Sequence, residues 1–238
     1  MALPKLNTAQ YELKVPSTGK TIEYRPFLVK EEKILLMALE GEEEKEMAKA
    51  IKQILSQCIL TENFKIDNLA LVDVEYIFLK VRGKAVGDKS KIFIECTNTE
   101  CENKIELELD LEKIEIDTHK DHTDLIKLTD DIQVRMVPPK MEYLMATVSK
   151  NQIDIVMDVI RDSISDIIQG KEGFSAQDHT KEELEDFLNS LNSGQFQSVR
   201  EFFETMPALR HDIEYTCNKC NKTEKQTLQG LASFFASA

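Results

Sequence analysis

Cys96-Thr-Asn-Thr-Glu-Cys101 and Cys217-Asn-Lys-Cys220 carry four of the five cysteines in this chain. We call these two segments the cysteine clips. The residues that flank them alternate apolar and polar side chains, as in Lys91-Ile-Phe-Ile-Glu before the first clip and Asp212-Ile-Glu-Tyr-Thr before the second. A period of two residues is typical of strands with one buried face. We therefore expect each clip at the tip of a β-hairpin.

Paired cysteines at this spacing point to metal binding, because two thiolates two to four residues apart can bind one ion across a tight turn. Two clips together supply four thiolates and predict one structural zinc ion per chain, with the ligands Cys96, Cys101, Cys217 and Cys220. Four thiolates close the tetrahedron and leave no position for a reactive water molecule.

The distance between the clips along the chain makes the predicted site a split zinc ribbon. Residues 102–216 lie between them, whereas the cysteine pairs of a compact ribbon are about 15–20 residues apart. Two other readings stay open, namely reduced thiols packed at hairpin ends and a disulfide within each clip. The N-terminal residues lack a long apolar region, which predicts a reducing cytosolic environment and disfavours disulfides.

Composition limits the classes of function. The chain has 238 residues, of which 42% are hydrophobic, and this is enough for a globular core without disulfides. Its apolar runs are shorter than the about 20 residues that span a bilayer, so we expect a soluble protein with no membrane span. A net charge of −13 makes nucleic acid an unlikely partner, because such binding draws on clustered Lys and Arg.

The first half of the sequence predicts a hairpin followed by helices. Alternating runs around Pro16-Ser-Thr-Gly19 indicate the hairpin, and apolar spacings of three and four predict helices from Lys30 to Gly41, around residues 47–59, and from Leu69 to Arg82 with Asn68 as its cap. Cys58 belongs to an apolar helical stripe, so we expect it in the core and not at the metal.

In the second half, residues 113–124 are expected to form a polar connection, residues 125–137 resume the strand pattern, and Pro138-Pro139 ends it. Helices are expected at residues 141–149 and along residues 153–168, although the β-branched content leaves part of the latter ambiguous. Residues 170–177 are expected to form a loop, and Thr180-Lys-Glu-Glu183 matches a capping box at the start of a helix. Another helix is predicted from about residue 195 to Pro207.

These patterns predict an α+β fold in which helices pack around small antiparallel hairpins. We expect one unit that spans residues 1–238, because the proposed metal joins both halves of the chain. Its expected subregions are an N-terminal hairpin with helices (1–90), the first zinc hairpin and β region (91–137), a helical region (138–210), and the second zinc hairpin with an apolar tail (211–238).

The last eleven residues, from Leu228 to Ala238, are rich in apolar side chains and carry no charged side chain. They can cover the core of the protein itself. Alternatively, Leu231, Phe234 and Phe235 can anchor the segment in a groove of a partner protein.

A search for catalytic motifs finds no glycine-rich phosphate loop, no nucleophile elbow and no metalloprotease helix. The many carboxylates fit exposed positions of helices and strands, so no acid/base pair stands out. We therefore expect that the protein is not an enzyme.

Two stretches carry a family resemblance: Thr18-Gly-Lys-Thr-Ile-Glu-Tyr-Arg-Pro-Phe-Leu-Val-Lys-Glu-Glu-Lys-Ile-Leu-Leu, and Phe202-Phe-Glu-Thr-Met-Pro-Ala-Leu-Arg-His with the clip that follows. The chain resembles the baseplate hub and hub-assembly proteins of T4-type contractile-tailed phages. The resemblance implies a late viral protein that acts with other baseplate or hub proteins in the host cytoplasm during assembly, with the tail baseplate of the virion as a further location.

The favoured hypothesis is a non-enzymatic baseplate protein in which zinc holds two remote hairpins together and so presents surfaces to other tail proteins. The alternative is a zinc-ribbon adaptor in viral transcription or replication, which would bind a polymerase or nucleic acid. The acidic chain and the scarcity of aromatic residues among basic ones favour the baseplate hypothesis.

Overall fold

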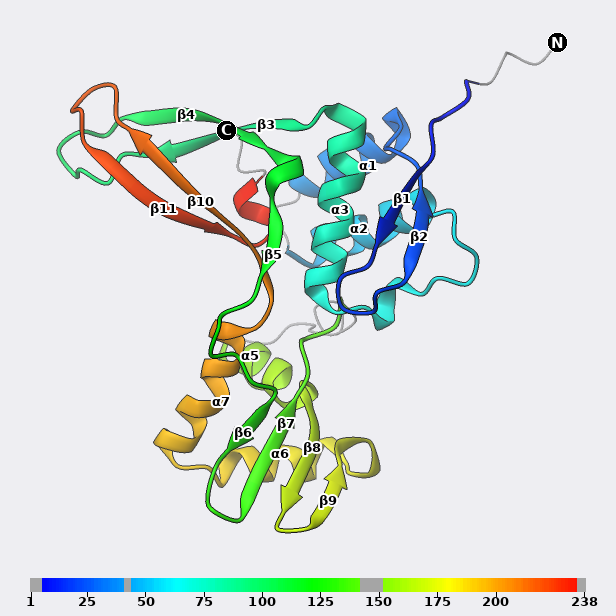
Figure 1. The fold of residues 1–238 in the computed structure, drawn as a ribbon, viewed down its shortest axis with the longest axis vertical. Helices are drawn as coiled ribbons and strands as arrows, with labels where there is room; N and C mark the ends of the chain where they lie inside the picture. The colour runs from blue at the N-terminus through cyan, green and yellow to red at the C-terminus, as the bar shows by residue number, and fades with distance from the viewer. Residues whose placement is uncertain (1–5, 41–43, 142–151, 235–238) are drawn as a thin grey trace. The chain divides into compact units, whose positions relative to one another are not determined.

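The computed structural model describes residues 6–40, 44–141 and 152–234. Its contacts divide the chain into two compact units: unit 1 joins Met1–Asp117 to Ala208–Ala238, and unit 2 is Thr118–Pro207 (Figure 1). Both units contain helices and small antiparallel sheets, which confirms the predicted α+β class. The boundaries of the two units differ from those of the four expected subregions. That the chain behaves as one unit stays a prediction, and the units are described separately.

Unit 1 begins with the expected hairpin, in which Tyr11 pairs with Tyr24 and Lys14 with Thr21. Three helices follow, and the last of them is capped by Gly87 in a backbone conformation with φ 110° that favours glycine. The bounds of these elements are β1 Tyr11–Lys14, β2 Thr21–Tyr24, α1 Val29–Glu40, α2 Glu44–Cys58 and α3 Leu71–Val86.

Helix α3 forms the centre of the apolar core of unit 1. Ile77, Phe78 and Leu79 are fully buried, and the Phe78 ring meets Phe27 edge to face with centroids 5.3 Å apart. The buried Asp73 carboxylate at the start of the helix accepts hydrogen bonds from the backbone N–H and the hydroxyl of Ser17. These bonds attach the β1–β2 turn to α3.

The remaining strands of unit 1 form two longer hairpins. One is a two-stranded sheet of β3 and β4, and the other joins β5 at its base to give the order β11-β10-β5 (Figure 1). The bounds are β3 Lys89–Glu95, β4 Lys104–Asp110, β5 Glu115–Asp117, β10 Ala208–Thr216 and β11 Thr223–Gln229. Both predicted hairpins are thus present, and each clip lies between its two strands.

The described residues of unit 2 form a four-stranded antiparallel sheet with the order β6-β7-β8-β9 and three helices. Thr180 with Glu183 forms the predicted capping box at the start of α6, and Asn192 with Gln195 forms a second one at α7. The bounds are β6 Leu125–Lys127, β7 Ile132–Met136, α5 Gln152–Asp162, β8 Ile164–Gln169, β9 Glu172–Ser175, α6 Lys181–Asn189 and α7 Ser193–Thr205.

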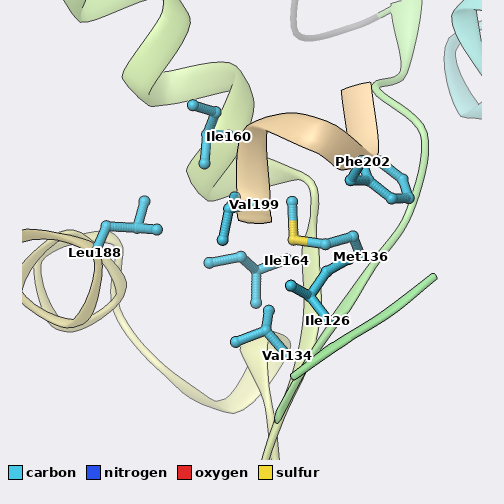
Figure 2. Close-up of a cluster of buried hydrophobic side chains, with 8 residues drawn as sticks. All are labelled: Ile126, Val134, Met136, Ile160, Ile164, Leu188, Val199 and Phe202. Carbon is cyan, nitrogen blue, oxygen red and sulfur yellow. The ribbon is translucent and has the colours of Figure 1, made fainter. Parts of the chain in front are cut away.

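A cluster of apolar side chains from the sheet and the helices fills the core of unit 2. Figure 2 shows Met136 and Ile164 of the sheet converging with Val199 and Phe202 of α7. Burying such large side chains contributes about 1.5–3 kcal/mol each. The buried members are Ile126, Val134, Met136, Ile160, Ile164, Leu188, Val199 and Phe202.

Four local predictions were wrong. Residues 153–168 do not form one helix, because α5 ends at Asp162 and residues 164–169 pair with β7 as β8. Residues 172–175, expected in a loop, form β9 against β8. Asn68 ends a short 3₁₀ turn, and Ala70 precedes α3 without a side-chain cap. Residues 115–117, expected in a polar connection, form β5. The helix expected at 141–149 lies largely outside the described residues.

None of the described helices has the length and apolar character that crossing a membrane requires.

Candidate metal centre

The two cysteine clips are closed by the same type of backbone hydrogen bond, although four residues separate the cysteines of the first clip and two those of the second. In each clip the N–H of the first cysteine donates a hydrogen bond to the carbonyl two residues beyond the second cysteine: Cys96 to Asn103 and Cys217 to Lys222, both at 2.9 Å. The residue after the second cysteine is left-handed in both, with φ 46° at Glu102 and 56° at Asn221. Both clips therefore end in the same type of turn.

The four clip cysteines converge on one point in unit 1. Their sulfur atoms all lie within 4.8 Å of one another. Cys96 Sγ is 3.6 Å from Cys220 Sγ, and Cys101 Sγ is 3.7 Å from Cys217 Sγ, so both close pairs join different clips. All four are free thiols and not disulfides within the clips. A tetrahedron with metal–sulfur bonds of about 2.3 Å has sulfur atoms about 3.8 Å apart, so the four residues fit a metal ion.

The four cysteines differ in burial and in the pKa of their thiols. Cys101 and Cys217 are buried, whereas Cys96 and Cys220 are partly exposed. Backbone amides of Cys220 and Lys219 donate to the Cys217 sulfur and lower the pKa of that thiol. Burial raises the pKa of Cys101. Cys217 is therefore the thiol best prepared to bind as a thiolate, and a metal ion would have to displace a proton from Cys101.

Polar side chains next to the cysteines connect the two hairpins. Asn103 Nδ2 donates to Cys217 Sγ at 3.4 Å and to Asn218 Oδ1 at 2.7 Å. Lys219 Nζ donates to the Cys101 carbonyl at 2.7 Å, and Thr97 Oγ1 donates to Glu224 at 2.9 Å. Hydrogen bonds of this kind orient metal ligands and tune their basicity. The two lysines of the second clip region, Lys219 and Lys222, also place positive charge near the four thiols.

The sequence predicted the cysteines but not these polar partners. Asn103 and Lys219 give no independent signal, because isolated amides and lysines are common in turns. The only indication was their position within two residues of a clip cysteine.

The remaining predicted residues have different surroundings. Cys58 is fully buried at the end of α2, as expected for a core residue, and burial raises the pKa of its thiol to about 11. Phe234 is also fully buried within unit 1, and its carbonyl accepts a bond from Ser90. Phe234 thus lies in the core of unit 1 in this structure, and its role as an anchor for a partner stays a prediction. The Leu231 side chain and Phe235 lie outside the described part, and their partner role stays a prediction.

The fold and the site together define an α+β protein with a four-cysteine centre assembled from remote hairpins. Residues 8–236 match the sequence model of a protein family that is described as T4 bacteriophage base plate protein. The chain therefore belongs to this baseplate protein family, as the resemblance implied. No curated protein and no solved structure gives a significant match to the chain.

Proposed function

We propose that this protein is a non-enzymatic structural or assembly component of the phage baseplate hub, in which one zinc ion per chain joins the β3–β4 and β10–β11 hairpins. The convergence of four sulfur atoms from two remote clips is the observation that carries the zinc assignment. An all-sulfur tetrahedral donor set suits zinc, and it suits a structural site because four thiolates complete the coordination.

The weakness of the hairpins without a cross-link supports this role for zinc. The β3–β4 sheet has two strands, and isolated two-stranded hairpins are marginally stable in water. Its exposed face carries the ion pairs Lys89–Glu108 and Lys91–Glu106, and exposed pairs contribute only about 0–1 kcal/mol each. A metal ion at the tips would supply the missing stabilisation and hold both hairpins as a surface for other tail proteins.

Membership in the baseplate family supports the assignment to the tail, and the hub is our more specific proposal. The protein would act in the host cytoplasm during assembly. To test this, the zinc-loaded protein is mixed with each purified baseplate hub protein of the same phage, and complexes are detected by size-exclusion chromatography. A stable complex with a hub protein is expected, whereas binding to wedge or tube proteins only would contradict the hub assignment. Quantitative mass spectrometry of purified tails then shows whether the protein is retained.

A further inference from the structure

A groove of about 470 Å³ lies between β3 and β11 within unit 1. Its walls include the apolar side chains of Ile92 and Leu228, and Phe93, which is 38% exposed, lies at its side. The metal centre lies beyond one end, where Thr97 still lines the groove, and Ser233 lines it near the C-terminal 3₁₀ turn.

The groove follows the unpaired edge of β3 and not one of its faces. Four consecutive residues, Ile92–Glu95, line it. Successive side chains of a strand point to opposite faces, so an unbroken run of lining residues means that the groove follows the strand edge. Strand β3 pairs with β4 alone, and its other edge has no partner strand among the described residues.

The pairing register identifies the free backbone groups of β3. The Cys96 N–H bonds the Asn103 carbonyl, and hydrogen-bonded positions alternate along an antiparallel pair. Ile92 and Ile94 are therefore bonded to β4, whereas the N–H and C=O groups of Phe93 and Glu95 point to the groove. A strand edge with free backbone groups can accept another strand.

The opposite wall repeats this arrangement on β11. At the two ends of the β10–β11 ladder, the Cys217 N–H donates a hydrogen bond to the Lys222 carbonyl, and the Gly230 N–H donates one to the Leu209 carbonyl. The same alternation leaves the backbone groups of Lys225 and Thr227 on the outer edge of β11 without a partner strand in the described part of the chain. Lys225 and its neighbour Gln226 both line the groove.

One of the residues that line the groove, Tyr215, carries a buried hydroxyl. Tyr215 is 4% exposed and lines the groove, and its hydroxyl has no hydrogen-bond partner among the described residues. A buried polar group left unpaired costs about 1–3 kcal/mol. An occupant with a backbone or side-chain polar group at this position would remove that cost.

Contacts between neighbouring segments lie at both ends of the groove. The four cysteines lie together at the hairpin tips at one end, and at the other the Ser90 hydroxyl of β3 donates to the Phe234 carbonyl at 3.1 Å. From this geometry we propose that the groove binds an extended segment of another baseplate protein, which adds a strand to the free edge of β3 and hydrogen-bonds the Tyr215 hydroxyl. The choice of a baseplate partner rests on the proposed function, and strand addition to a free edge is a common mode of peptide recognition.

Matched proline variants test the edge. Phe93 and Glu106 are directly opposite each other in the β3–β4 ladder. Proline at either position removes an N–H that does not bond the other strand, so Phe93→Pro blocks the groove edge and Glu106→Pro blocks the far edge at similar cost to the hairpin. Tyr215→Phe removes only the hydroxyl, which has no hydrogen-bond partner in the part of the chain that the structure describes.

The experiment measures the affinity of the full-length, zinc-loaded variants for each purified baseplate protein of the same phage, and the mass of each variant alone by light scattering. Far-ultraviolet circular dichroism and zinc content identify variants that remain folded. We expect Phe93→Pro to weaken binding at least tenfold and Tyr215→Phe several-fold, with Glu106→Pro close to wild type.

The outcomes separate this inference from the proposed function. A baseplate partner that binds wild type, Tyr215→Phe and folded Phe93→Pro equally would overturn the groove proposal and leave the proposed function intact. No binding by any baseplate protein would overturn both. A dimer of wild type that Phe93→Pro abolishes would show that a second copy occupies the edge, which also overturns the proposal. If Phe93→Pro does not fold, Tyr215→Phe alone decides, and unchanged binding would contradict the proposal.

Discussion

Unit 1 and unit 2 differ in which segments of the chain they join. Unit 2 is one continuous segment, Thr118–Pro207, and its sheet joins strands that follow one another along the chain around an apolar cluster. Unit 1 combines Met1–Asp117 with Ala208–Ala238 and contains all five cysteines. Its α3 region has an apolar core, but its two long hairpins extend to tips where thiols meet. The comparison contrasts apolar burial between local elements in unit 2 with the metal cross-link that we propose for the remote hairpins of unit 1.

Metal removal should give the largest effect and should separate the two units. Structural zinc contributes about 10–16 kcal/mol of apparent binding free energy in small zinc peptides. After chelation we expect amide hydrogen exchange to accelerate by at least 100-fold at the tips of β3–β4 and β10–β11, while β6–β9 keep their protection. Exchange followed by mass spectrometry measures both regions in one sample. Equal acceleration in both units would contradict the contrast.

Truncation of the unit 2 core tests the other side of the comparison. Phe202 is 1% exposed and packs in the cluster of Figure 2. Phe202→Ala should lower the free energy of unfolding by about 3–5 kcal/mol, because it removes buried area and leaves a cavity. Urea denaturation measures this loss. Ile153→Ala is the control, since Ile153 is 74% exposed and should change stability by less than about 0.5 kcal/mol. Zinc content should stay at the wild-type value in both variants.

An ion pair tests the part of unit 1 that does not depend on metal. The buried Glu31 carboxylate accepts from Arg25 at 2.8 Å and from the Leu28 N–H at 2.9 Å. Burial alone would raise the Glu31 pKa, but these hydrogen bonds lower it overall. Glu31→Gln leaves Arg25 without its charged partner and should cost about 3 kcal/mol at pH 7.

The sign of the pH dependence follows from the lowered pKa. A carboxyl group whose pKa is lower in the folded state adds stability above its unfolded pKa of about 4.3, and this stability is lost as the pH falls through the folded pKa. As the pH is lowered below about 5, the urea midpoint of wild type should therefore fall more steeply than that of Glu31→Gln. Parallel pH profiles would rule out this role.

Helix capping in unit 2 should give the smallest effect. Thr180→Ala removes the side chain that accepts from the Glu183 N–H and should cost about 1 kcal/mol. Asn192→Ala removes the matching cap of α7 and should cost a similar amount. Thermal denaturation measures both losses. A loss above about 3 kcal/mol for either variant would show that the cap has a further role.

The sequence predicted those features that depend on short-range spacing. The clips, the flanking strands, the capping box at Thr180 and the core position of Cys58 are all encoded within a few neighbouring residues. The convergence of the clips followed from the chemistry of four thiolates and not from any local pattern. A single cysteine pair would not have indicated it.

Features that depend on distant partners were not predictable in the same way. The apolar spacing of α5 continues through Ile164, Ile167 and Ile168, yet β-branched residues also fit a strand. These residues form strand β8 because they pair with β7, as Ile167 does with Val134. Residues 115–117 form a strand only because Ala208–Arg210 pair with them from the other end of unit 1. Their own sequence is too short and polar to indicate it.

Native mass spectrometry tests most directly whether one metal ion joins the two hairpins. The protein is purified without added zinc and without a metal-binding tag, alongside Cys220→Ser and the control Cys58→Ser, whose thiol is buried away from the clips. We predict one zinc ion per chain in wild type and Cys58→Ser, and a clear loss in Cys220→Ser. Folded, reduced wild-type protein without metal, or equal zinc content in wild type and Cys220→Ser, would contradict the four-cysteine centre.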